Sequence, residues 1–155
     1  GQSLAGLNLS ASNMEFVVLV ASDLSRMELL MSDMSFADLR KANLTNADMR
    51  GVTLRRANLS EADLTGARLS PVNIIGSNVQ RWTAHLENAR LSEAKLRGVD
   101  MSYAAMSGAD LSGADLRDAN LRGADLQDAV MTDADLRGAD IRDVDTRGAT
   151  DFKPR

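Results

Sequence analysis

The side chains that most often carry out covalent chemistry are scarce in this sequence. Among 155 residues there is one histidine, His85, and no cysteine, so a nucleophile paired with a base has almost no candidates. The many carboxylates would need a cleft to shift their pKa values before they could act as acids or bases. We therefore expect a protein that is not an enzyme, with His85 as a solvated surface side chain.

Charged side chains recur at intervals of twenty residues. Arg97, Arg117 and Arg137 form one such series, and Asp115 and Asp135 stand two residues before the last two arginines. If the chain returns to the same place every twenty residues, these side chains form neighbouring columns of opposite charge, whose net attraction is modest. The arginine column is then either a solvated, self-neutralised surface or a secondary contact site. The glycine-rich nonapeptide of calcium-binding β-rolls is missing, so we expect no metal site and no cofactor.

Apolar side chains outside the expected core gather in the N-terminal third. Phe16 and Phe36 are twenty residues apart, and Leu30 and Met31 lie between them. Exposed apolar clusters usually mark a partner, a cap or an interface. The sequence leaves open whether these residues pack under a local cap or contact a partner. Trp82 is a further candidate, either as a contact or as a plug over an irregular corner.

An apolar residue stands at every fifth position, from Leu4 to Val79 and again from Leu86 to Ile141. In an α-helix a step of five residues rotates by roughly 140°, so these sites would spiral around the helix. In a straight β-strand successive sites would fall on opposite faces. The chain must therefore bend once per repeat, which places every apolar site inside a coil.

The other positions of the repeat agree with a bending chain. From residue 37 onward, alanine stands two residues before most apolar sites and faces the same way in an extended segment. The residue between them is often Asp or Asn, as at Asp110 and Asn120, and these short side chains favour turns. The last two positions are mostly polar or glycine, as a corner requires.

Three consecutive repeats show the pattern best: Ala109-Asp110-Leu111-Ser112-Gly113, Ala114-Asp115-Leu116-Arg117-Asp118 and Ala119-Asn120-Leu121-Arg122-Gly123. They closely resemble the A(D/N)LXX repeat of the pentapeptide-repeat family, and the resemblance covers about the whole chain. It implies an all-β fold, a right-handed quadrilateral parallel β-helix with four repeats per coil. On this basis we expect a solenoid of about seven coils.

The sequence departs from the pattern at three places within a single domain, 1–155. Residues 1–36 predict irregular N-terminal coils, 37–79 and 84–143 regular coils, and 144–155 a frayed end. The interval from Val79 to Leu86 is two residues too long. It predicts a two-residue insertion near residues 80–83, as a bulge or short loop at one corner.

Some pentapeptide-repeat proteins mimic DNA and bind a type II topoisomerase, gyrase. Mimicry needs dense negative charge, with one phosphate per ~3.4 Å of strand. Here arginines interrupt the acidic positions, the net charge is −4, and the central sites hold no phenylalanine. We keep DNA mimicry as the alternative to a general binding role.

The sequence thus predicts a non-enzymatic protein-interaction or scaffolding module. The expected partner is a protein or a second copy, bound through the apolar N-terminal coils or the bare rod ends; nucleic acid is an unlikely partner. No apolar stretch approaches membrane-spanning length, and cytoplasm is the default compartment. The predicted contact residues are Phe16, Leu30, Met31 and Phe36, with Trp82, Arg97, Arg117 and Arg137 as secondary sites.

Overall fold

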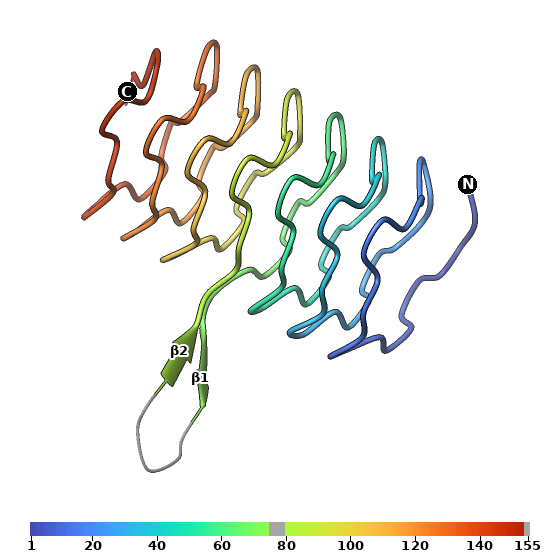
Figure 1. Ribbon diagram of the computed structural model, residues 1–155. Helices are drawn as coiled ribbons and strands as arrows, with labels where there is room; N and C mark the ends of the chain where they lie inside the picture. Colours follow the sequence, from blue (N-terminus) through green and yellow to red (C-terminus); the bar gives the residue numbers. More distant parts are fainter. Residues whose placement is uncertain (75–79, 154–155) are drawn as a thin grey trace.

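The chain winds into a rod of stacked coils that runs from the N-terminus to the C-terminus (Figure 1). The computed structural model describes residues 1–74 and 80–153. Parallel bridges join residues twenty apart: Asp23 pairs with Asn43, and Asn43 with Asp63. Because the repeat is five residues long, four repeats complete one coil and the rod has four sides. This is the parallel β-helix that the sequence predicts.

Each corner of the rod is a tight turn that the repeat sequence specifies. In one repeat the Ala47 N–H donates to the Leu44 carbonyl oxygen at 3.1 Å, and Asn46, the third residue of the turn, has a φ of 58°. A type II turn requires positive φ at this position, which glycine and asparagine tolerate best. The Asn43 side chain accepts a hydrogen bond from the Thr45 N–H at 3.1 Å. This bond explains why the outward position is so often Asp or Asn.

Apolar layers fill the inside of the rod. The leucines and methionines at every fifth position, and the alanines two residues earlier, are buried through the middle coils, as at Leu59 and Ala57. Each buried leucine contributes roughly 1.5–3 kcal/mol. Ser32 takes the place of an alanine and is buried, and its hydroxyl donates to the Leu29 carbonyl oxygen at 2.8 Å. Ser32 therefore fits inside because the turn carbonyl satisfies its hydroxyl.

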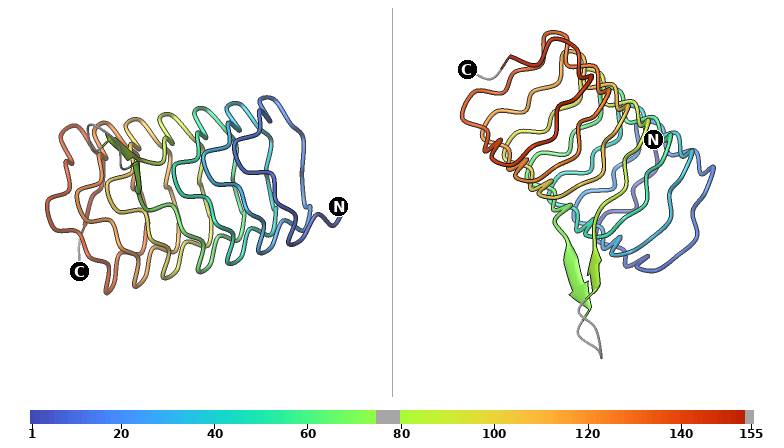
Figure 2. Two further views of the ribbon diagram at one scale, coloured as in Figure 1. Left: turned by 90° about the horizontal axis from the view of Figure 1, so that it is seen from below. Right: turned by 60° about the vertical axis from the view of Figure 1, so that its left-hand side comes forward.

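A hairpin interrupts the coils, and here the predicted two-residue insertion is wrong. Thr53 bridges to His85, an offset of 32 residues instead of twenty, so the insertion is twelve residues long. It contains β1 (Val72–Ile74) and β2 (Gln80–Trp82), which pair antiparallel and project away from the rod (Figure 2).

The error has a physical cause in the apolar pattern. Ile74 falls on the five-residue interval by coincidence, but in the structure it is 39% exposed on the hairpin. Val79, also expected in the core, lies outside the described residues. Ile74 stands at the spacing expected of a core position in a coil, and its apolar side chain is equally compatible with a β-strand whose side chains alternate between two faces.

The two ends of the rod are less buried than its middle. At the N-terminal end Leu7 is 48% exposed, and at the C-terminal end Ile141, Val144 and Phe152 are half-buried against the core. Within residues 1–74 and 80–153, no helix is long and apolar enough to cross a membrane.

Columns of side chains along the rod define the surfaces used below. The phenylalanine edge consists of Phe16, Phe36, Arg56 and Asn88. The hairpin edge consists of Met31, Gly51, the hairpin base and Tyr103. Between these two edges lies the His85 face, with the outward side chains Asp33, Thr53 and His85. The arginine edge carries Arg97, Arg117 and Arg137, and is diagonally opposite the phenylalanine edge.

Candidate functional site

The phenylalanine edge carries an exposed aromatic stack. The rings of Phe16 and Phe36 are 4.9 Å apart and only 7° from parallel. Their exposed fractions are 66% and 43%. The Arg56 guanidinium extends the column, 5.8 Å from the Phe36 ring centre. The predicted pair thus forms a continuous aromatic surface and is not covered by a local cap.

The hairpin edge brings together predicted residues that are far apart in sequence. A Cβ placed on Gly51 would lie 3.3 Å from Met31 Cγ and, at an ordinary contact distance, 3.8 Å from Trp82 Cβ, so Met31 and the hairpin base both lie beside this glycine. Trp82 lies at the end of β2 and is 45% exposed. Leu30 and Met31 are half-buried, and Met31 lies beside the same glycine. Trp82 therefore belongs to an apolar cluster, whereas the sequence offered only a plug or an isolated contact.

The His85 face is a polar surface that lies between these two apolar edges. A hollow of about 500 Å³ lies against the phenylalanine edge and includes Asp33, Phe36 and Arg56 in its wall. A second hollow of about 450 Å³ lies along β2 and reaches from Trp82 to His85. The two apolar edges and the two hollows therefore share one side of the rod.

His85 is held in a charged cluster at the middle of this face. Its Nδ1 lies 3.0 Å from Glu87 Oε1, and Arg55 Nη2 lies 3.2 Å from the same oxygen. Burial alone would raise the pKa of Glu87, but hydrogen bonds from Arg55, the backbone and His85 lower it below its usual value. Glu87 is therefore ionised and offsets the charge of Arg55. Its other oxygen, Oε2, is buried and accepts no hydrogen bond within the described residues.

The arginine edge lies away from this surface. Arg117 binds Asp115 through Nε at 2.7 Å and Nη2 at 2.6 Å, and Arg97 Nη2 lies 3.2 Å from Asp118. Arg137 pairs with Asp135 in the same way. The predicted arginine ladder is therefore present, but its guanidinium groups are already bound to carboxylates. The structure does not bring it near the aromatic stack.

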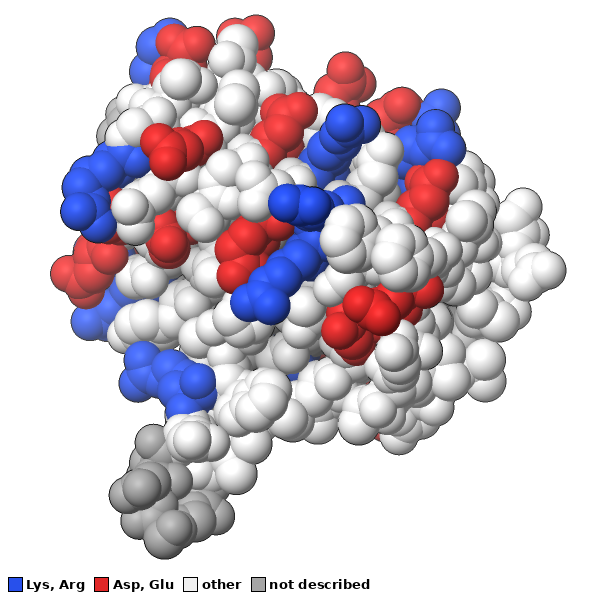
Figure 3. All heavy atoms as spheres, in the orientation of Figure 1, with Lys and Arg blue, Asp and Glu red and all other residues white. Residues whose placement is uncertain are grey.

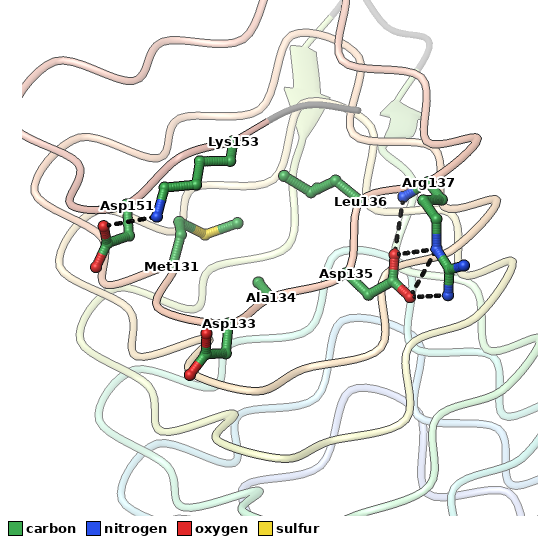
Figure 4. A pocket seen from close by; sticks show the side chains of 8 residues that line it. All are labelled: Met131, Asp133, Ala134, Asp135, Leu136, Arg137, Asp151 and Lys153. Atoms are coloured by element: carbon green, nitrogen blue, oxygen red, sulfur yellow. Dashed lines mark hydrogen bonds and ion pairs between the residues drawn. The ribbon is translucent and has the colours of Figure 1, made fainter.

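A further hollow, of about 410 Å³, opens at the C-terminal end of the rod (Figure 4). Met131 and Leu136 lie in its wall, and four of its charged groups form two ion pairs, Lys153 with Asp151 and Arg137 with Asp135. Within the part of the chain that the structure describes, no cluster of three or more His, Asp or Glu side chains could hold a metal ion. The hollow thus has charged groups around core side chains that are themselves buried.

Sequence reasoning missed Arg55, Arg56 and Glu87. Arg56 had a signal, because it stands twenty residues after Phe36 and must share its column. Glu87 had none, since its partner Arg55 is 32 residues away across the inserted hairpin. Its position depends on an insertion whose length the sequence did not reveal.

Known proteins with similar sequences or structures place this chain in a family. The model of pentapeptide repeats matches residues 32–70, 84–113 and 109–148, in eight copies. The break in this match, 71–83, coincides with the hairpin. No curated protein gives a significant match.

Several solved structures match over most of the chain. A trypsin-treated form of QnrB1, a plasmid-mediated fluoroquinolone resistance protein, is 18% identical over 96% of this chain and 88% of its own, with a TM-score of 0.65. HetL from the cyanobacterium Nostoc sp. strain PCC 7120, a pentapeptide repeat protein involved in heterocyst differentiation regulation, is 31% identical over 99% of this chain and 83% of its own, with a TM-score of 0.34. The similarity to QnrB1 concerns the fold alone. The chain belongs to the pentapeptide-repeat family, and its fold is the right-handed quadrilateral β-helix.

Proposed function

We propose that this protein is a non-enzymatic binding module whose His85 face docks a partner protein. One observation carries the proposal: the phenylalanine edge and the hairpin edge border the same face. The apolar residues around that face are Phe16, Phe36, Leu30, Met31 and Trp82. Protein interfaces draw most of their binding energy from a few such aromatic anchors and gain specificity from the polar groups beside them.

The aromatic stack contributes little to folding, which supports a role in binding. Phe16 and Phe36 have φ values of 59° and 60°, a left-handed conformation that costs roughly 1–2 kcal/mol for a residue with a Cβ. Stacking returns about 0.5–1.5 kcal/mol. Because the rings are largely exposed, burial adds little more. The same left-handed conformation recurs at other corners, as at Arg26 and Met31, so the exposure of the stacked rings, and not their strain, supports a role in binding.

The His85 face supplies specificity through its charges. Asp33 and Arg56 line the hollow beside Phe36, and neither makes an ion pair within residues 1–74 and 80–153. Groups of opposite sign in the wall of one hollow select a partner whose charges match them in position.

Replacement of Phe16 and Phe36 together by serine tests this proposal. Partners captured by the wild-type chain and by the double variant are compared by quantitative mass spectrometry, and we expect the specific partner to be reduced at least tenfold. The free energy of unfolding should change by less than about 1.5 kcal/mol, because the stacking lost is worth about 0.5–1.5 kcal/mol and serine, which also has a Cβ, keeps the same left-handed strain. Val130→Ser is the matched control, since Val130 is 37% exposed on another face. Equal capture by the double variant and the wild type would contradict the proposal.

A second copy is another occupant for the apolar N-terminal coils or the rod ends. Sedimentation of the same double variant separates the two cases: loss of a self-associated species would assign the stack to a homodimer. If the wild type and the double variant both sediment with the mass of one chain, the stack does not form a homodimer, and a partner protein remains its proposed occupant.

DNA mimicry toward gyrase has less support. Basic and acidic side chains alternate over the face shown in Figure 3, and the arginine edge is neutralised pair by pair. Mimicry of a phosphate backbone requires an uninterrupted acidic surface. We expect micromolar protein to leave gyrase supercoiling unchanged; inhibition at that concentration would favour the alternative.

A further inference from the structure

The hairpin leaves two strand edges without a neighbour. β1 and β2 form a two-stranded sheet, and no backbone hydrogen bond joins either outer edge to another described segment. A two-stranded hairpin alone is marginally stable in water, and three or more strands with an apolar face are usually needed. Open edges of this kind pair with other strands unless charge or proline prevents it.

The side chains of the hairpin sort into an apolar and a polar face. Val72 lies opposite Trp82, and Ile74 opposite Gln80, so these four side chains share one face. Asn73 and Arg81 share the other. Ile74 and Trp82 remain 39% and 45% exposed. The apolar face therefore lacks a complete cover.

The two outer edges differ in charge, and this difference selects the occupant. β1 has no charged residue, whereas β2 carries Arg81 at its centre, with the guanidinium 4.5 Å from the Tyr103 ring centre. Two copies of β2 pairing antiparallel would place Arg81 against its own copy, which is unfavourable. Two copies of β1 would place Asn73 against Asn73, and Val72 against Ile74. Only the β1 edge is complementary to itself.

We propose that β1 pairs antiparallel with β1 of a second copy, centred on Asn73. The product is a four-stranded sheet with strand order β2-β1-β1-β2 about a two-fold axis. One of its faces then carries two rows of side chains, and in each row Trp82 and Val72 of one copy lie next to Ile74 of the other. The proposal does not use the phenylalanine edge, so it stands apart from the proposed docking of a partner protein.

Single-cysteine variants test the register directly, because the chain has no native cysteine. In Asn73→Cys the two sulfurs meet across the axis, since opposed Cα atoms in an antiparallel pair lie about 4.5–5.5 Å apart, within reach of a disulfide. We expect rapid disulfide-linked dimers under mild oxidation. Gln80→Cys, one strand further from the axis, should form them at least tenfold more slowly. Equal rates for the two variants would overturn the proposal.

A charge placed on the pairing strand tests the interface without cross-linking. Sedimentation velocity over a range of concentrations should show the wild-type mass rising from one chain toward two. Ile74→Lys should weaken this association at least tenfold, whereas Gln80→Lys, opposite it on β2, should change it by less than about twofold. A wild-type mass of one chain at every concentration would refute the pairing, and so would equal effects of the two lysines. The emission of Trp82, the only tryptophan, reports whether each hairpin stays folded.

Discussion

At the scale of single residues, one aspartate often serves two purposes. Asp135 accepts a hydrogen bond from the Arg137 backbone N–H at 3.2 Å, which fixes the turn, and binds the Arg137 Nε at 2.8 Å. Asp140 and Arg142 repeat the arrangement. The Arg137 side-chain hydrogen bond is the largest cause that lowers the pKa of Asp135 to about 2. Turn geometry and charge neutralisation thus arise from the same pair.

These pairs make folding sensitive to acid. The folded pKa values of Asp135 and Asp140, about 2, lie below the usual 3.8, so the ionised carboxylates favour the folded state. Their contribution is present above a pH of about 4 and is lost as the pH falls toward 2. We expect the urea midpoint, followed by circular dichroism, to be flat from neutral pH to about pH 5 and to fall below pH 4.

Nuclear magnetic resonance titration identifies the groups responsible. Arg137→Gln should raise the pKa of Asp135 while leaving Asp140, which is paired with Arg142, near its wild-type value. A wild-type Asp135 that titrates at its ordinary value would contradict the role given to Arg137.

At the scale of elements, an aromatic ring of the coil supports β2 of the hairpin. Arg81 lies over Tyr103, and a Cβ on Gly123 would come within 2.6 Å of two ring carbons of Tyr103. Gly123 also has a φ of 65°, in the left-handed region. A glycine in the following coil therefore keeps the support of the hairpin in place.

Two alanine substitutions separate steric support from backbone strain. Gly98 has the same φ of 65°, but a Cβ there would have no neighbour within 4 Å. Gly98→Ala should cost only the strain, roughly 1–2 kcal/mol. Gly123→Ala should cost at least about 1 kcal/mol more, because the Tyr103 ring must move. Urea unfolding gives both values, and Trp82 emission should shift only in Gly123→Ala. An equal loss of unfolding free energy in the two variants would show that the Tyr103 ring moves aside at no cost, which would contradict its supporting role.

The sequence predicted the coil better than the surface, for a reason visible in these elements. Every inward position obeys the same spacing, so Leu59 or Leu111 could be placed inside without knowledge of the rest. The position of Trp82 beside Gly51 depends on how far the inserted segment runs. The length of this segment was underestimated because Ile74 stands at the spacing of the repeat. The residues around Ile74 are compatible with either a coil or a strand.

At the scale of the whole molecule, stability is shared between neighbouring coils. Leu116 N donates to the Asp135 carbonyl oxygen at 2.9 Å, and Asp115 N donates to the Ala94 carbonyl oxygen at 3.0 Å. Each coil thus contacts only the coils before and after it. Such solenoids gain stability as a sum of coil and interface contributions, so local damage spreads to adjacent coils.

Leu116→Asp tests this coupling. The leucine is fully buried, and an unpaired carboxylate in its place should cost several kcal/mol. Hydrogen exchange should show lost protection in the coils on both sides of residue 116 first. Val130→Asp adds the same group at an exposed outward position and should change stability by less than about 1 kcal/mol. A uniform loss of protection along the rod would show that the coils unfold as one unit and would contradict this prediction.

The ladder resumes its register directly after the hairpin, since Thr53 bridges to His85 and His85 bridges to Ala105 at the ordinary interval. A twelve-residue insertion at one corner therefore leaves the stacking of the coils on either side unchanged. That corner is a natural grafting point: foreign loops of different lengths inserted between residues 71 and 83 should be displayed on a scaffold that keeps its shape.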